Sequence, residues 1–313
     1  MNAASPLDVS VVMPTWNRPQ MLRASVDAVL AQTAPFRELI LADDGSDAPT
    51  RTLLEQYAAL PRVRLLQRRH CGNPGAVRNA AIREAAGRYI AFADSDDLWH
   101  ERKLELQFAA LAARPDCRWS YTASIGIDAQ GRPITPGKPN PAWPTNSLLE
   151  SLATFSENVA LPSVIAERSL LFAAGLFDES LGCYEDYDLW LRLAALSEVV
   201  MLPEPLVKVR LHANHFSRGN HYSSLMGRHK FLTNAISRVV TPAVRARLQR
   251  AQALDSARLA RLSALAGDAH AALFRLRASF AHGWVMPRWW LIAARAHSRM
   301  WSLRVKRLRE QWS

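Results

Sequence analysis

The first 93 residues alternate between short apolar runs and segments with helical spacing, and this alternation constrains the fold more than any other feature. Each run rich in Val, Ile and Leu, typical of a buried strand, is followed by a stretch in which apolar residues recur every three or four positions. The pattern predicts an α/β domain with a mostly parallel sheet. The expected strands are residues 8–13, 38–42, 63–66 and 89–93, and the expected helices are 20–33, 50–60 and 75–86.

Carboxylates are concentrated at the ends of two of these strands. Asp43 and Asp44 follow the second strand, and Asp94, Asp96 and Asp97 follow the fourth. Open α/β sheets bind ligands at the carboxyl ends of their strands, so both clusters can share one crevice. Carboxylate oxygens suit Mg²⁺ or Mn²⁺, which commonly take one or two carboxylates together with substrate phosphates. The simpler alternatives are a turn at the Asp-Gly dipeptide of the first cluster and a helix N-cap at Asp97.

The pattern is less regular beyond residue 113. Residues 114–146 are rich in Pro and Gly and predict a loop or an excursion over the site. Residues 176–195 predict a loop that becomes an amphipathic helix, residues 199–202 and 206–211 predict two short strands, and the remainder predicts helices rich in Ala, Leu and Arg. We therefore expect a catalytic domain at residues 1–222 and a basic helical region at residues 223–313.

The net positive charge comes from the C-terminal region. The chain has a net charge of +11, whereas residues 231–313 carry 15 Lys and Arg and 3 Asp and Glu, so that residues 1–230 are nearly neutral. Residues 284–309 combine arginines with tryptophans, which is typical of a helix on an anionic membrane surface. The alternative is a helix packed on the catalytic body with a solvated arginine face. No DNA or RNA recognition motif is present, so we expect no specific nucleic-acid partner.

The lack of a signal peptide or membrane span and the spacing of the cysteines predict a cytoplasmic chain. The N-terminus lacks the basic start and apolar run of a signal peptide, and no stretch reaches the roughly 18 to 20 apolar residues of a membrane span. The three cysteines are widely spaced without a CxxC pair, so neither a disulfide framework nor a zinc site is indicated. We expect a cytoplasmic protein with peripheral association at the inner face of the membrane.

Four segments, in this order, resemble the motifs of family 2 glycosyltransferases. They are VSVVMPTWNRP, LILADDGSD, GNPGAVRNAAIREAAGRYIAFADSDDLW and YEDYDLWLRL, and the resemblance covers residues 8–215. It implies the Rossmann-like GT-A fold and an inverting reaction. A sugar would pass from a nucleotide-diphosphate donor, by resemblance a UDP-sugar, to a hydroxyl of a glycan or lipid-linked glycan in cell-surface polysaccharide biosynthesis.

The resemblance also implies which residues face the donor. Asp44 matches the carboxylate that reads the uracil ring, and Arg78 matches an arginine that faces the nucleotide. His212 resembles a histidine near the diphosphate, where Arg210 is an alternative and His215 a weaker candidate. The full set of donor-side residues is Pro14, Thr15, Asn17, Asp43, Asp44, Arg78, Asp94 and His212.

The metal and the general base follow from the same resemblance. Asp94 and Asp96 form the DxD motif, with Asp96 as the main ligand of Mg²⁺ or Mn²⁺ and Asp97 as the alternative ligand. Glu185 and Asp186 match the ED motif, in which Asp186 takes the proton of the acceptor hydroxyl.

Other interpretations of this segment stay open. Asp186 could instead cap a helix that begins near Tyr187, and Asp188 is a neighbouring carboxylate that could be mistaken for the base. Glu185 and Trp190 are acceptor-side candidates, although a helical aromatic residue such as Trp190 is commonly part of the core.

Two rival functions remain at this stage. A nucleotidyltransferase also pairs an α/β sheet with metal-binding carboxylates, but it would usually carry a Gly-rich phosphate loop after the first strand, and MPTWNRP is not such a loop. A non-catalytic protein that binds anionic surfaces could have kept an inactive fold. The presence of Asp186 argues against the second rival.

Overall fold

The computed structural model describes residues 5–134, 147–211, 221–239, 241–283 and 286–311. The chain forms two compact units, Met1–Ala213 and Asn214–Ser313. The boundary expected from the sequence, between residues 222 and 223, lies further along the chain, inside α8 (His221–Arg238).

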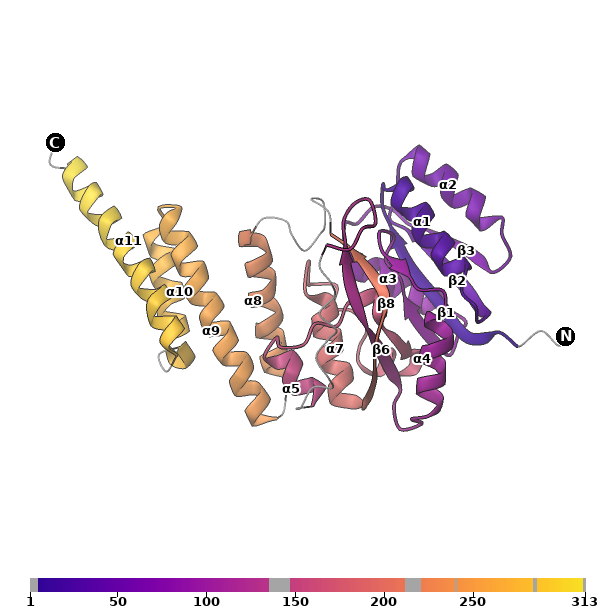
Figure 1. Ribbon diagram of the computed structural model, residues 1–313. Coiled ribbons are helices and arrows are strands. Elements are labelled where there is room, and N and C mark those ends of the chain that lie inside the picture. Colours follow the sequence, from indigo (N-terminus) through magenta and orange to yellow (C-terminus); the bar gives the residue numbers. More distant parts are fainter. Residues whose placement is uncertain (1–4, 135–146, 212–220, 240, 284–285, 312–313) are drawn as a thin grey trace. The chain divides into compact units, whose positions relative to one another are not determined.

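The first unit contains an eight-stranded sheet flanked by helices (Figure 1). Strand order is β3-β2-β1-β4-β7-β6-β8-β5. In one half, β3, β2, β1 and β4 are parallel, and the strands and helices that the sequence predicts here are confirmed. The elements of this half are β1 (Leu7–Thr15), α1 (Pro19–Leu30), β2 (Phe36–Asp43), α2 (Ala48–Ala58), β3 (Val63–Gln67), α3 (Pro74–Glu84) and β4 (Tyr89–Phe92).

The other half of the sheet is mixed, because β7 runs antiparallel to both of its neighbours and β5 runs antiparallel to β8. β6 and β8 are parallel over most of their length. The elements are β5 (Leu98–Trp99), α4 (Lys103–Ala112), β6 (Trp119–Ile127), α5 (Leu148–Ala153), the 3₁₀ helix η1 (Leu161–Ser163), β7 (Ile165–Glu167), α6 (Arg168–Ala173), α7 (Glu185–Leu196) and β8 (Val199–Arg210).

Two expectations for this half are wrong. Residues 114–146 are not wholly a loop, because Trp119–Ile127 form β6, which lies between β7 and β8 in the sheet. Most of the Pro and Gly residues that suggested a loop come after this strand, whereas Trp119 and Tyr121 are buried. The two short strands expected at 199–202 and 206–211 are one strand, β8, with a register irregularity against β6 where Pro205 pairs with Ala123.

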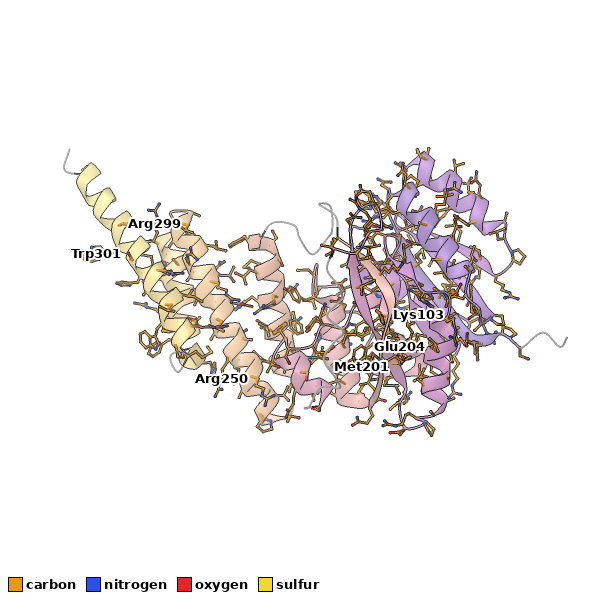
Figure 2. The ribbon with its side chains drawn as sticks, viewed as in Figure 1. Lys103, Met201, Glu204, Arg250, Arg299 and Trp301 are labelled. Carbon is orange, nitrogen blue, oxygen red and sulfur yellow. The ribbon has the colours of Figure 1, made fainter. Side chains whose placement is uncertain are left out.

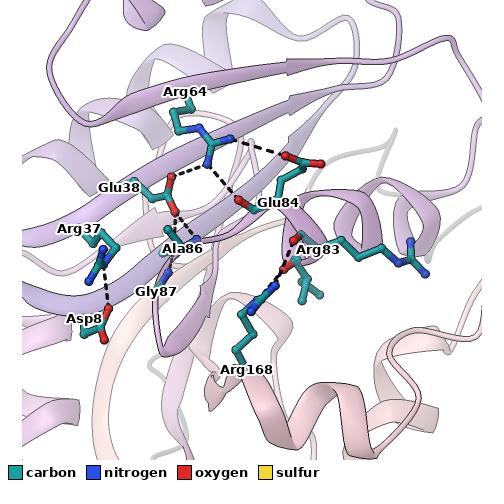
Figure 3. A network of polar contacts seen from close by, with 11 residues as sticks. Asp8, Arg37, Glu38, Arg64, Arg83, Glu84, Ala86, Gly87 and Arg168 are labelled. Atoms are coloured by element: carbon teal, nitrogen blue, oxygen red, sulfur yellow. Dashed lines mark hydrogen bonds and ion pairs between the residues drawn. The ribbon is translucent and has the colours of Figure 1, made fainter.

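A buried carboxylate joins three elements of the parallel half (Figure 3). Ser10 Oγ and the backbone N–H of Ala86 both donate to Glu38 Oε1, at 2.6 and 2.7 Å, and Arg64 donates to Oε2 at 2.8 Å. Burial alone would raise the pKa of Glu38, but these hydrogen bonds outweigh it and lower the pKa. Gly87 is required beside them, because a Cβ there would lie 2.5 Å from the backbone nitrogen of Ser10. The start of β4 is thereby fixed against β1 and β2.

The described residues of the second unit form four helices, α8, α9 (Pro242–Leu265), α10 (Ala269–Gly283) and α11 (Pro287–Gln311). On α11, Trp289, Ala293 and Ala296 recur at helical spacing and are buried. Trp289 donates to Ser279 Oγ of α10 at 2.9 Å. Trp289 is therefore core of this unit, unlike the exposed Trp290.

No helix among the described residues is both long and apolar enough to span a bilayer.

Candidate active site

The topology brings the carboxyl ends of β1, β2 and β4 together, because these three strands are parallel neighbours. Thr15, the last residue of β1, pairs with Asp43, the last residue of β2. Asp94 follows β4 after one intervening residue. Ligands bind to open α/β sheets at this edge, so the segments predicted from the sequence converge where a ligand would be expected.

The loop after β1 is fastened to the loop after β2. Pro14 pairs with Ala42 in the sheet, and Asn17 has a left-handed conformation with φ 49°. The Asn17 N–H donates to Ser46 Oγ at 3.1 Å, and Asn17 Oδ1 accepts from the Asp47 N–H at 2.7 Å. Asn17 thus holds the two loops in register, and its role beside the nucleotide stays a prediction.

The acidic pair after β2 is buried and hydrogen-bonded. Asp43 accepts from the backbone N–H of Ser46 at 3.1 Å, which is the turn that the simpler interpretation expected. Asp44 accepts from the N–H groups of Cys71 and Gly72, both at 2.9 Å. Asp43 therefore shapes the turn, while the Asp44 carboxylate holds the loop after β3.

An aromatic pair lies beside Asp44. His70 Nδ1 is 2.9 Å from both the carbonyl oxygen and the carboxylate of Asp44. The ring of Trp16 stacks on His70 with 4.6 Å between centroids and 17° between planes, and Trp16 is 45% exposed. The sequence analysis did not single out Trp16 or His70, because the stacking joins positions on two separate loops.

Arg78 connects the two motifs that were predicted to face donor and acceptor. Its guanidinium donates to Asp94 at 2.8 Å and to Glu185 at 3.2 Å, and its side chain is 7% exposed. Burial alone would lower the pKa of Arg78, but the charges of Asp94 and Glu185 outweigh burial, so the pKa is raised above its usual value. Arg78 is therefore a permanent cation between the DxD and ED motifs.

The acidic cluster after β4 is held by two further arginines. Arg18 Nη1 lies 2.5 Å from Asp96 Oδ2. Asp97 accepts from the backbone N–H of Arg210 at 2.8 Å. Burial, followed by the charges of Asp94 and Asp96, raises the pKa of Asp97 well above its usual range.

Two interpretations of this cluster need correction. Asp97 is not a helix N-cap, because the next residues form β5 and α4 begins only at Lys103. The Arg210 guanidinium donates to the backbone carbonyls of Asp96, Asp128 and Ala129, so it serves the protein here rather than a phosphate. His212 and His215 lie outside the described residues.

The carboxylates after β4 fit a hard divalent cation, although they do not form a complete cage. In the part of the chain that the structure describes, no group of three or more His, Cys, Asp and Glu side chains is arranged to hold a metal ion. Mg²⁺ and Mn²⁺ at diphosphate sites need only one or two carboxylates, because the phosphates supply further oxygens. Asp96 already attracts a cationic guanidinium, so its surroundings suit positive charge.

The ED motif begins α7. The residue before the helix, Tyr184, has φ 63°, and Glu185 and Asp186 occupy the first turn, where the helix dipole favours negative charge. Asp186 is therefore not the cap of a helix beginning near Tyr187. Burial, and then the charge of Glu185, raises the pKa of Asp186 to about 7, despite the hydrogen bond from the Tyr187 N–H at 2.7 Å.

Neighbouring side chains on α7 have structural roles. Asp188 is 1% exposed and accepts from Arg192 at 2.6 Å, so it is tied into an ion pair on its own helix. Trp190 is fully buried among the rings of Phe92, Trp119 and Phe177. The proposal that Trp190 lines an acceptor site is corrected, because a fully buried ring presents no surface to a ligand.

Comparisons with known proteins indicate the family of this chain. The model of glycosyl transferase family 2 matches residues 10–155. An uncharacterized glycosyltransferase of Rickettsia felis is 31% identical over 217 residues, which are 69% of this chain and 35% of that protein. The Escherichia coli protein WfgD, a UDP-Glc:alpha-D-GlcNAc-diphosphoundecaprenol beta-1,3-glucosyltransferase, is 38% identical over 103 residues, which are 33% of this chain and 40% of WfgD. The chain thus spans less than half the length of these relatives.

A solved structure shows the same fold. S. aureus TarS 1-349 in complex with UDP-GlcNAc superimposes with a TM-score of 0.71 at 18% identity, covering 96% of this chain and 92% of that one. The GT-A architecture expected from the motifs is therefore confirmed. This chain belongs to the family 2 glycosyltransferases.

Proposed function

We propose that this glycosyltransferase moves a sugar with inversion from a UDP-sugar to a hydroxyl of a lipid-linked glycan, in polysaccharide biosynthesis. The observation that carries the proposal is the bridge made by Arg78. It contacts Asp94 of the DxD motif and Glu185 of the ED motif, and its charge also acts on Asp186, the assigned base. The carboxylates that would bind the donor and the one that would act as base therefore belong to one cluster.

The donor nucleotide is assigned to the loops after β1, β2 and β3. Asp44 already accepts two backbone N–H groups and lies 2.9 Å from His70 Nδ1, but a carboxylate has about four acceptor positions, so one remains for the imide N–H of a uracil. The exposed ring of Trp16 beside it offers an aromatic face to the base. Uridine is favoured because the names of both WfgD and the TarS complex contain a UDP-sugar.

The diphosphate is assigned to the acidic cluster after β4. Asp96, with Asp94, would hold Mg²⁺ or Mn²⁺, and Asp97 is the alternative ligand. When bound, the cation supplies the positive charge that stabilises the departing nucleoside diphosphate. Asp97 is less suited to this role, because it is more deeply buried and accepts from the Arg210 N–H.

Asp186 is assigned as the general base. The acceptor oxygen attacks the anomeric carbon while the bond from that carbon to the diphosphate oxygen breaks, and the acceptor proton passes to Asp186. A pKa of about 7 suits this task, since a base works best when its pKa lies near the operating pH. Glu185 is held by Arg78 and serves to position this turn of α7.

The C-terminal unit is assigned to the membrane that would carry a lipid-linked acceptor. WfgD carries diphosphoundecaprenol in the name of its acceptor, and a lipid-linked acceptor would lie at a membrane. On α11, Trp290 and Trp301 are 53% and 63% exposed, and Arg288 and Arg299 are exposed as well. Figure 2 shows Arg299 and Trp301 on α11. We assign this helix to the anionic inner face of the membrane, with the chain cytoplasmic and peripheral.

A nucleotide screen followed by a transfer assay tests the function. Thermal shifts would be measured with UDP, GDP, dTDP and CDP, each with Mn²⁺ and with EDTA, because a ligand of the native state raises the melting temperature with its occupancy. We expect a shift for UDP that EDTA removes. The matching UDP-sugar and a GlcNAc-diphospho-lipid acceptor should then give a product whose anomeric configuration, measured by NMR, is opposite to that of the donor.

Any of three results would contradict the proposal. A shift with a different nucleotide would replace the assigned donor. Transfer that persists in EDTA, or that retains the anomeric configuration, would remove the metal or the inverting mechanism.

A further inference from the structure

The ion pair between Arg18 and Asp96 places a cation on the carboxylate assigned as the main metal ligand. Arg18 Nη1 is 2.5 Å from Asp96 Oδ2, and the two residues are 78 positions apart in the sequence. Arg18 occupies one oxygen of Asp96 and places a positive charge beside it, which opposes binding of a divalent cation to this carboxylate. Binding of the cation therefore favours departure of this guanidinium from Asp96.

The backbone around Arg18 is fixed, so that only its side chain is free to move. Asn17 is fastened to Ser46 and Asp47, and the carbonyl oxygen of Arg18 accepts from the Leu22 N–H at 3.0 Å at the start of α1. The Arg18 side chain is 30% exposed and makes no capping hydrogen bond to α1. A guanidinium in this position can turn about its own side-chain bonds without a change in the loop.

Arg78 provides the contrast. Its side chain is 7% exposed, contacts two carboxylates and lies over the ring of Phe177 at 5.6 Å. Removing it from Asp94 would leave buried charges unpaired, which is strongly unfavourable. The pair of Arg18 and Asp96 is held more weakly on the arginine side, because the Arg18 side chain is 30% exposed while Asp96 is 12% exposed. Arg18 is thus the exchangeable cation of the cluster, and Arg78 the permanent one.

We infer that Arg18 is a diphosphate-binding residue that exchanges partners with the metal. Before the metal binds, Arg18 neutralises Asp96; when a divalent cation takes Asp96, the guanidinium turns to the phosphate oxygens of the donor. Arginine suits this second partner, since its planar fork matches phosphate geometry. The inference rests on the proposed function, because it presumes a nucleoside diphosphate at this edge of the sheet.

The exchange predicts effects of opposite sign on two ligands. Without nucleotide, Arg18 competes with the metal, so Arg18→Ala and Arg18→Gln should lower the Kd for Mn²⁺ by about two- to fivefold, as expected for losing a partly exposed ion pair. With saturating Mn²⁺, the same variants should raise the Kd for UDP by about fivefold or more, because a charge-assisted phosphate contact is lost. The Kd for uridine, which has no phosphate, should not change.

Mn²⁺ binding would be followed by the EPR signal of the free ion, and nucleotide binding by calorimetry. Arg37→Ala is the matched control. Arg37 pairs with Asp8 at 2.8 Å near the amino ends of β1 and β2, whereas the candidate site lies at the carboxyl ends of these strands. Arg18→Gln retains most of the side-chain volume if the alanine variant folds poorly, and Arg18→Lys should recover part of the UDP affinity.

Three outcomes would overturn the inference in distinguishable ways. Unchanged or weaker Mn²⁺ binding in both neutral variants would show that Arg18 does not compete for Asp96. Tighter Mn²⁺ binding with unchanged UDP binding would remove the diphosphate contact. Wild-type protein that binds no Mn²⁺ even with UDP would overturn the proposed metal site itself, and the exchange with it.

Discussion

The two units of this chain depart from the usual distribution of residues in opposite directions. In Met1–Ala213, carboxylates and arginines that normally stay in water are buried at the ends of parallel strands. In Asn214–Ser313, large apolar side chains that are normally covered are exposed, among them Phe274 at 69% and Trp301 at 63%. Buried charge has a cost that a catalytic site repays, and exposed aromatic surface is typical of a binding surface. The contrast agrees with catalysis in the first unit and motivates the association proposed for the second.

The substitution Asp186→Asn should have the largest effect on the catalytic role assigned to the first unit. If the buried carboxylates of the first unit serve chemistry, removing the base should reduce kcat by about 10²–10⁴-fold while UDP binding is kept. The Asn variant should gain stability relative to the wild type as the pH rises from 3.8 to about 7 and keep the full difference above that, because burial raises the folded-state pKa of Asp186 and its ionised form opposes folding.

Asp188→Asn is the control for this prediction. It breaks the buried pair with Arg192 and should lower the melting temperature. An Asp186→Asn variant that keeps its activity would transfer the role of base to another residue.

The second unit also holds a buried charge, and this one should affect stability alone. Asp255 is fully buried and paired with Arg228 at 2.7 Å and with Arg258 at 3.2 Å. Burial raises the pKa of Asp255 even so. Arg228→Met should cost about 2–3 kcal/mol in the free energy of unfolding, somewhat less than loss of a fully buried partner, because Arg258 remains.

Urea denaturation of the full chain would measure this cost, with exposed Arg277→Met as the control. Loss of UDP binding without loss of stability in Arg228→Met would contradict the assignment of separate roles to the two units.

The pH dependence of the reaction tests the same carboxylate without mutation. Asp186 must be ionised to accept a proton, and its pKa is about 7. We expect kcat/KM to rise about tenfold per pH unit below pH 7 and to level off above it. A profile that is already flat at pH 5 would show a base with an ordinary carboxylate pKa.

The smallest expected effects concern the exposed aromatic residues. Trp290→Ala and Trp301→Ala should each weaken sedimentation with phosphatidylglycerol vesicles severalfold and leave binding to phosphatidylcholine vesicles low. Transfer to a water-soluble acceptor should be unchanged. Trp289→Ala is the matched comparison, because this buried ring should affect stability first. Equal binding of all variants would leave α11 without a membrane role.

Much of the catalytic unit could be predicted from local pattern. The parallel strands and their helices followed from apolar periodicity, and the family followed from four motifs in order. The strand Trp119–Ile127 was missed, because the segment after it is rich in Pro and Gly and because it pairs with β7 and β8, which are distant in the sequence. Trp190 could not be placed, since a helical tryptophan has the same spacing whether it faces a core or a ligand.

The sequence by itself determined which residue types stand at the strand ends, and therefore the family and the class of reaction, because those depend on short motifs and local periodicity. Only the tertiary structure decided which charged side chains form ion pairs with one another. Arg18 reaches Asp96 and Arg78 reaches Glu185 across 78 and 107 positions, and Asp188 is taken up by Arg192 while Asp186 is not. Such pairings depend on distances that the folded sheet sets, and the pKa values follow from them, because burial and neighbouring charge exist only in the folded chain.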